Sequence, residues 1–217
     1  MEVETRAILD EVLSQLSDIM KMKQKDFPNI DLYMDQVTAF MDEKLYSTLR
    51  ENEAGKRIIT KTMINNYAKN SLLPAPEKKK YTKEHMMTLI FIYYFKSFLT
   101  INDIEELLNP ITEKYFGKKE GQRLGDIYDE IFESGEARLE HLKLDLEDKY
   151  EASLELFQDV DGDDGEYLRL FSFVCYLSYD IFVKKMLIER LVDESARKRQ
   201  EAEEQKKEKE KEDKKKK

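Results

Sequence analysis

The sequence predicts an all-α fold. Its 217 residues include only seven Gly and four Pro, too few for the many tight turns of an all-β domain. Hydrophobic residues make up 41% of the chain and aromatic residues 11%, which is enough for the core of one medium domain or two small ones. In several segments apolar residues recur three and four positions apart, which is the spacing of amphipathic helices.

The N-terminal part of the chain predicts a pair of amphipathic helices. Residues 3–23 carry an apolar stripe at helical spacing. Phe27-Pro28 ends this first helix, because proline disfavours helical geometry in the residue before it. A second apolar stripe predicts a helix within residues 31–50, and a polar loop is expected over residues 51–57.

A short helix and a connector that contains two prolines are expected next. Thr60 or Thr62 can cap the helix, which runs to Asn70. Residues 72–80 read Leu-Leu-Pro-Ala-Pro-Glu-Lys-Lys-Lys, and the two prolines exclude a helix across them. This connector therefore returns the chain toward the next element.

Two further helices follow in the middle of the chain. Thr82 begins a helix that is apolar on nearly all sides, which is typical of a helix at the centre of a bundle. Thr100 or Asn102 caps the next helix. Because proline cannot continue the backbone hydrogen-bond pattern, we expect that helix to end near Pro110.

The C-terminal part predicts two long helices. Residues 121–157 form an acidic helix with an interruption near Gly135, and an acidic loop follows over residues 159–166. Residues 166–193 form a strongly apolar helix. Its aromatic stretch, residues 171–183, is expected to pack into the helical bundle, or else to line a dimer core or an effector pocket.

The last residues differ from the rest in composition. Residues 196–217 hold eleven Lys or Arg and seven Asp or Glu, with no large apolar residue. They have nothing to bury, so we expect a charged flexible tail or a charged extension of the preceding helix. Four regions result: 1–26, an N-terminal amphipathic helix; 27–116, the central domain; 117–195, a C-terminal helical region; and 196–217, the tail.

A basic island, residues 56–96, lies inside an otherwise acidic chain. It contains nine Lys or Arg and two Glu, a net charge of +7, whereas the whole chain carries −9 and the remainder therefore −16. Charge separated in this way favours one surface that binds a polyanion. The island is also expected to contain a helix, a Pro-bounded turn and a second helix. This combination makes nucleic acid the leading candidate partner.

Enzyme classes find no support in the sequence. There are two His and one Cys, and no cluster of such residues has metal-ligand spacing. Residues 159–170 suggest a calcium loop, but Asp164 stands at position 6 and Leu170 at position 12, where Gly and Glu are needed. No phosphate-binding or dinucleotide fingerprint occurs. We therefore expect no catalytic residue, no metal site and no cofactor.

Location and redox state follow from similar observations. Cys175 is the single cysteine and lies among apolar residues, so a reducing compartment is compatible. The N-terminus lacks the pattern of a signal peptide, and the most apolar runs are shorter than a membrane span. We expect a cytoplasmic protein without membrane contact.

The region 27–110 resembles a known family of regulators. Lys80-Tyr81-Thr82 and Leu99-Thr100-Ile101-Asn102-Asp103-Ile104 follow the pattern of MerR-type winged helix-turn-helix proteins, at the end of the wing and at a helix entry. The same region is still more similar to an uncharacterised bacterial family of MerR-like helical proteins, domain of unknown function 1836. The motifs that carry this second resemblance are LYMDQVTAFM, TKTMINNYAKN and LLPAPEKKKY.

The resemblance implies a MerR-like winged helix-turn-helix core at residues 27–116, flanked by an N-terminal helix pair and a C-terminal helical extension, residues 117–195, that serves dimerisation or effector binding. It implies a bacterial transcription regulator that binds double-stranded DNA as a homodimer, with an unidentified effector. The short helix would face the major groove, and the lysine run would contact backbone phosphates. The predicted DNA-binding residues are Lys61, Thr62, Asn65, Asn66, Lys69, Lys78, Lys79, Lys80 and Tyr81.

The chain departs from the MerR pattern at three places. Asn65-Asn66-Tyr67 stands where the relatives have Arg-Tyr-Tyr, Ser71 replaces a turn glycine, and the wing is shortened to residues 76–80. A second interpretation therefore remains open, a helical protein-interaction or scaffold module that keeps the fold without DNA binding.

Overall fold

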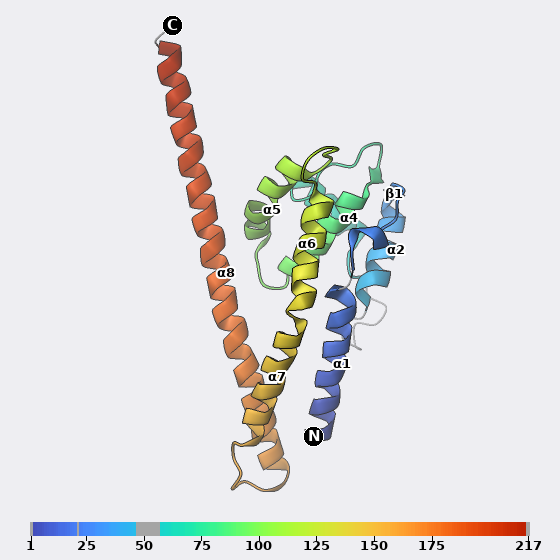
Figure 1. Ribbon diagram of the computed structural model, residues 1–217, viewed down its shortest axis with the longest axis vertical. Coiled ribbons are helices and arrows are strands. Elements are labelled where there is room, and N and C mark those ends of the chain that lie inside the picture. The colour runs from blue at the N-terminus through green and yellow to red at the C-terminus, as the bar shows by residue number, and fades with distance from the viewer. Residues whose placement is uncertain (1, 21, 47–56, 216–217) are drawn as a thin grey trace.

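The structure, a computed structural model, describes residues 2–20, 22–46 and 57–215 (Figure 1). It is mostly helical, and a single two-stranded sheet is found in the described part. The predicted polar loop at 51–57 lies, apart from Arg57, outside the described residues. The elements in chain order are α1 (Glu2–Met20), η1 (Gln24–Asp26), β1 (Leu32–Tyr33), α2 (Met34–Leu45), α3 (Lys61–Lys69), β2 (Lys80–Tyr81), α4 (Lys83–Phe95), α5 (Ile101–Tyr115), α6 (Leu124–Ala137), α7 (Leu139–Leu154) and α8 (Gly162–Lys215).

The larger hydrophobic core is built around α4. All residues from His85 to Ile92 are buried, which confirms the prediction of a central helix. Helix α6 closes this core with Tyr128, whose ring stacks on Phe132 at 4.2 Å and meets the edge of Phe27 at 5.4 Å. The apolar residues on all sides of α4 are thus explained by the elements that surround it.

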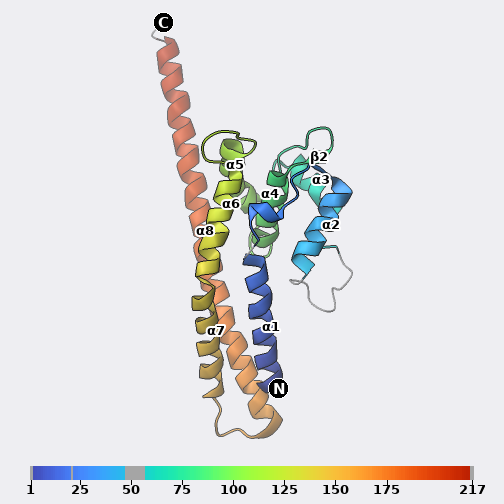
Figure 2. The same ribbon diagram turned by 45° about the vertical axis from the view of Figure 1, so that its right-hand side comes forward.

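A smaller core joins the N-terminal helix to α7 and the first part of α8. Leu9 and Leu13 of α1 pack with Tyr150 of α7 and Phe173 of α8. Helix α7 and the first part of α8 form an antiparallel hairpin beside α1, below the larger core in Figures 1 and 2. The acidic helix predicted over residues 121–157 is divided at Arg138, whose amide donates to the carbonyl of Gly135 at 3.0 Å, so the predicted interruption is confirmed.

Two predicted caps are present. The Thr60 hydroxyl accepts a hydrogen bond from the amide of Met63 at the start of α3. The Thr100 hydroxyl accepts one from the amide of Asp103 at the start of α5. Such bonds satisfy amides that the first helical turn leaves unpaired. Local sequence therefore narrowed each helix start to two candidate caps, and the first of each pair is the cap in the structure.

The predicted end of α5 near Pro110 is wrong, because the helix continues to Tyr115. Pro110 removes only one backbone donor, the one that would otherwise bind the carbonyl of Glu106. Leu108 and Thr112 are buried, so packing holds the helix together across the proline.

Helix α8 begins earlier than expected, and of the two alternatives for residues 196–217 the structure has the extension of the preceding helix as far as Lys215. It begins at Gly162, inside the predicted acidic loop, and Asp163 and Asp164 lie in its first turn, where negative charge favours a helix start. It continues as helix through the predicted tail to Lys215, and Figure 1 shows it extending past the rest of the molecule. Within 171–183 the packing expected for the whole stretch is found mainly at Phe173 and Leu177.

Candidate nucleic-acid interface

Helix α2 is the element against which α3 packs. Asp42 of α2 fixes the entry to α3, because its carboxylate accepts the amide of Ile58 at 2.9 Å and the guanidinium of Arg57 at 2.9 Å. On α3 itself, Ile64 and Tyr67 are buried against the core. These contacts leave the opposite side of α3 to solvent.

A left-handed turn ends α3. Ser71 has φ of 60°, its amide donates to the carbonyl of Ala68, and the amide of Leu72 donates to the carbonyl of Tyr67 at 2.9 Å. This pair of bonds is the Schellman arrangement, which favours Gly at the left-handed position. The glycine expected from the MerR pattern at position 71 is therefore explained by backbone geometry.

A tight turn presents the lysine run. The amide of Lys80 donates to the carbonyl of Glu77 at 2.9 Å, and Lys78 and Lys79 between them have φ of 49° and 63°. Positive φ at both central residues is the type I′ turn, which usually carries Asn-Gly. Both lysines are exposed, so they form the tip of this turn.

The turn is held beside α3 by a short antiparallel sheet. Leu32 of β1 pairs with Tyr81 of β2, and Tyr33 pairs with Lys80. Lys80 also lies over the ring of Tyr33, with its nitrogen 5.8 Å from the ring centre. Helix α2 contacts both α3 and β2, and Figure 2 shows these two elements at the same end of the molecule.

The exposed side of α3 carries most of the residues predicted to face DNA. Thr62, Asn65, Asn66 and Lys69 are all exposed. Lys61 is also exposed, but it forms an ion pair with Asp35 of α2. The structure thus brings together the predicted residues of α3 and those of the turn, and it pairs one of them with a carboxylate.

Tyr81 has a different position. Its side chain is 2% exposed and packs against His85 with ring centres 5.4 Å apart. Burial raises the pKa of its phenol. Tyr81 therefore anchors the base of the turn from inside, whereas the side chain of the preceding residue, Lys80, is exposed to solvent.

Other basic residues of the island have structural partners. Lys83 donates to the side-chain oxygen of Asn29 at 2.7 Å, and Arg57 is bound to Asp42. Lys96 lies over the ring of Tyr93 at 4.8 Å, and burial lowers its pKa. By contrast, no ion pair or side-chain hydrogen bond is found for Lys69, Lys78 or Lys79 within the described part of the chain.

His85 connects the turn to α4 through a capping box. Its Nδ1 accepts the amide of Thr82 at 3.0 Å, so the ring is held in its neutral form. The ring is 2% exposed, and burial lowers its pKa from 6.5 to about 4, although the carbonyls of Pro74 and Ala75 favour the charged form. The sequence alone did not indicate this structural role of His85.

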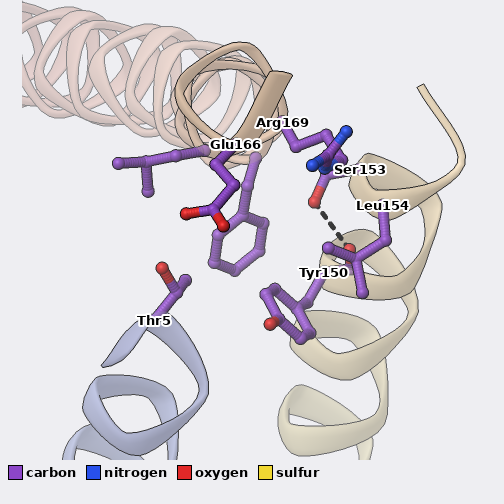
Figure 3. A pocket seen from close by; sticks show the side chains of 8 residues that line it. Thr5, Tyr150, Ser153, Leu154, Glu166 and Arg169 are labelled. Atoms are coloured by element: carbon purple, nitrogen blue, oxygen red, sulfur yellow. Dashed lines mark hydrogen bonds between the residues drawn. The ribbon is translucent and has the colours of Figure 1, made fainter. Parts of the chain in front are cut away.

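The cavities of the described residues outside this surface include an open groove and a small enclosed space. One, of about 380 Å³, is an open groove between the turn after α3 and α5, with Ser71, Asn109, Thr112 and Glu113 in its lining. The other lies where α1, α7 and α8 meet and is lined by Thr5, Tyr150 and Glu166, among others (Figure 3). Its volume is about 10 Å³, room for about one water molecule.

Neither a metal site nor a membrane span emerges from the described residues. No three His, Cys, Asp or Glu side chains there are arranged to hold a metal ion. None of the described helices combines the length and the apolar character that crossing a bilayer requires.

Comparison with known proteins gives one match. Neither a curated protein nor a solved structure matches the chain significantly. The sequence model of one family, described as Domain of unknown function (DUF1836), matches residues 22–131. The match covers α2 to α6 almost completely and includes the turn and the exposed side of α3. Since it spans half of the chain, the protein belongs to the DUF1836 family.

Proposed function

We propose that this protein is a DNA-binding transcription regulator of the MerR-like type, which binds duplex DNA with α3 and the turn at residues 77–80 and catalyses no reaction. The observation that carries the proposal is the turn. Two exposed lysines occupy left-handed positions that Gly or Asn would occupy more easily, next to the exposed polar side of a short helix. Strain retained at charged surface residues points to a role for the charges themselves.

The two surfaces fit the two parts of a DNA contact. Asn can pair bidentately with adenine in the major groove, and the exposed side of α3 offers Asn65 and Asn66 for this contact. Lysines contribute the sequence-independent attraction to phosphates, and Lys69, Lys78, Lys79 and Lys80 are available for it. Lys61 contributes less, because Asp35 already neutralises it.

The order of elements also supports the MerR-like interpretation. Helix α2, helix α3 and an exposed turn that leads into β2 follow one another, as in a winged helix-turn-helix. The wing is small, since β2 pairs with β1 rather than with a second strand of a long ribbon. A small wing leaves few phosphate contacts, so we expect modest affinity, with a salt dependence limited to those few contacts.

A titration of labelled duplex DNA at low salt tests the proposal. The wild-type chain is compared with a variant that combines Lys69→Glu, Lys78→Glu and Lys79→Glu. The matched control combines Lys206→Glu, Lys207→Glu and Lys209→Glu, three exposed lysines of α8, and changes the net charge equally. We expect binding by wild type and control and none by the first variant. Absence of binding by the wild type at low salt would overturn the proposal.

A further inference from the structure

The open groove of about 380 Å³ separates the end of α3 from the last turn of α5. Ser71 and the connector at residues 73–75 line it on the α3 side, and Glu113 and Phe116 are among the residues that line it on the α5 side. Small-molecule sites in proteins have volumes of about 300–1,000 Å³. The groove is therefore large enough for a small organic ligand.

We propose that this groove binds a small organic amine, a molecule with one ammonium group and an apolar body. The inference goes beyond the proposed function and does not depend on DNA binding. The groove lies within residues 68–116, whereas the resemblance places effector binding at residues 117–195. A ligand in the groove contacts the connector that leads from α3 to the turn at residues 77–80.

The polar groups that α5 offers to the groove are mainly acceptors. The Thr112 hydroxyl donates its hydrogen to the carbonyls of Leu108 and Asn109, both at 3.2 Å, so its lone pairs remain. The amide nitrogen of Asn109 is engaged with Glu105 at 3.5 Å. Glu113 is exposed, and no ion pair is found for its carboxylate within the described part of the chain. An ammonium group carries three donors and no acceptor, which complements this set.

The backbone adds negative charge at the same place. Helix α3 ends at Lys69 and α5 ends at Tyr115, and the last turn of each helix contributes to the lining. The carbonyl end of a helix carries about half a negative charge, so two such ends favour a cation between them. Lys69 and Lys114 belong to these turns but do not line the groove, and Lys114 lies over the ring of Tyr115 at 5.2 Å.

Negative charge continues on the other side of Asn109 and Glu113. A second groove, of about 370 Å³, shares these two residues with the first. It is also lined by three further carboxylates, Glu105, Glu106 and Glu203. Arg199, which lines it too, already forms an ion pair with Glu106. The wall that the two grooves share is therefore negative, and it repels an anionic ligand.

The apolar part of the groove fits the body of the ligand. Phe116 is half-buried, and His85 meets its ring edge-to-face with ring centres 4.7 Å apart. Pro74 and Ala75 supply further apolar surface from the connector. Because the ring of Phe116 is already held by the buried His85, little conformational freedom is lost when a ligand packs against it.

A nuclear magnetic resonance titration of the isotope-labelled full-length chain, without DNA, tests the site. The probes are phenethylamine and two molecules of similar shape, the anion phenylpropionate and the neutral phenylethanol. We expect the amine to cause saturable shifts of amides within residues 68–75 and 111–117. The other two probes should bind about 5-fold more weakly or less, because they lack the ion pair with Glu113.

Two variants separate charge from shape. Glu113→Gln should weaken amine binding about 5-fold, while Glu130→Gln, at an exposed position of α6, should leave it unchanged. Ala75→Trp fills the groove and should abolish binding, whereas Ala7→Trp, at an exposed position of α1, should not. Glu113 and Ala75 are both exposed, so the variants should fold, and circular dichroism checks this.

Equal or tighter binding of phenylpropionate or phenylethanol would overturn the proposal. Amine shifts that do not saturate, or that Glu113→Gln and Ala75→Trp leave unchanged, would overturn it as well. Since DNA is absent from the titration, its failure leaves the DNA-binding proposal standing, and loss of DNA binding leaves the amine site standing.

Discussion

The amide of Leu72 donates to the carbonyl oxygen of Tyr67 across 2.9 Å, and this bond ends α3 in a left-handed turn. Both residues are buried in the larger core, so the turn is fixed from inside. It determines where the chain leaves α3 and therefore where the lysine turn lies relative to the exposed side of the helix.

Ser71→Gly is expected to stabilise the protein. Ser71 has φ of 60°, a conformation that costs a residue with a Cβ about 1 kcal/mol and costs Gly almost nothing. The free energy of unfolding, measured by urea denaturation, should rise by about 1 kcal/mol. Ser71→Ala keeps the Cβ and should give no gain. Equal stability for the Gly and Ala variants would show that the backbone at position 71 is not strained.

Replacing the two lysines of the turn with residues that suit its backbone should raise stability and weaken DNA binding. Lys78→Asn combined with Lys79→Gly installs the pair preferred in type I′ turns, so unfolding should require about 1 kcal/mol more. The same change removes two charges and should lower affinity for duplex DNA. Lys78→Ala with Lys79→Ala removes the charges without relieving the backbone, so affinity should fall with no stability gain. If either double variant binds DNA as tightly as wild type, the two lysines do not contribute to DNA binding.

Asn65 and Asn66 should determine sequence preference rather than overall affinity. We expect selection from a random pool of duplexes to enrich a motif with the wild-type chain. Asn65→Ala with Asn66→Ala should lose about 1–3 kcal/mol of discrimination per lost base contact and keep salt-dependent binding. Asn102→Ala, an exposed Asn on α5, is the control. The same enriched motif with both variants would show that α3 does not read bases.

Acid should destabilise the fold through His85. Its pKa is lowered to about 4 in the folded state, whereas the unfolded chain protonates it near 6.5. The contribution of neutral His85 is therefore complete above pH 6.5 and is lost as pH falls from 6.5 to 4, at about 1.4 kcal/mol per unit. His85→Gln retains a capping-box side chain that does not titrate. Denaturation midpoints across this range should fall more steeply for wild type than for the variant, and parallel curves would contradict this role.

Local signals predicted much of the fold. Thr60 and Thr100 were each one of two cap candidates, because capping depends on a side chain and the amides just after it, and the structure has both as the caps. The central position of α4 followed from a helix without a polar side. Ser71 was marked by comparison with a turn glycine, and its φ gives the reason.

Features that depend on tertiary contacts could not be predicted in this way. Pro110 was expected to end α5, but buried neighbours hold the helix across it. The ion pair between Lys61 and Asp35 joins two helices, and no local sequence pattern predicts it. The exposure of Phe182 and its neighbours was missed for the same reason, since an apolar run shows that a surface prefers burial and not which chain buries it.

The salt dependence of DNA affinity tests the central claim most directly. If Lys78 and Lys79 each neutralise a phosphate, replacing both with Gln should reduce the slope of log affinity against log salt by about 1.8, because each contact contributes about 0.9. Replacing Lys206 and Lys207 of α8 with Gln should leave the slope unchanged. An unchanged slope in the turn variant, or an equal loss in the α8 variant, would contradict the assignment of the DNA contact to this turn.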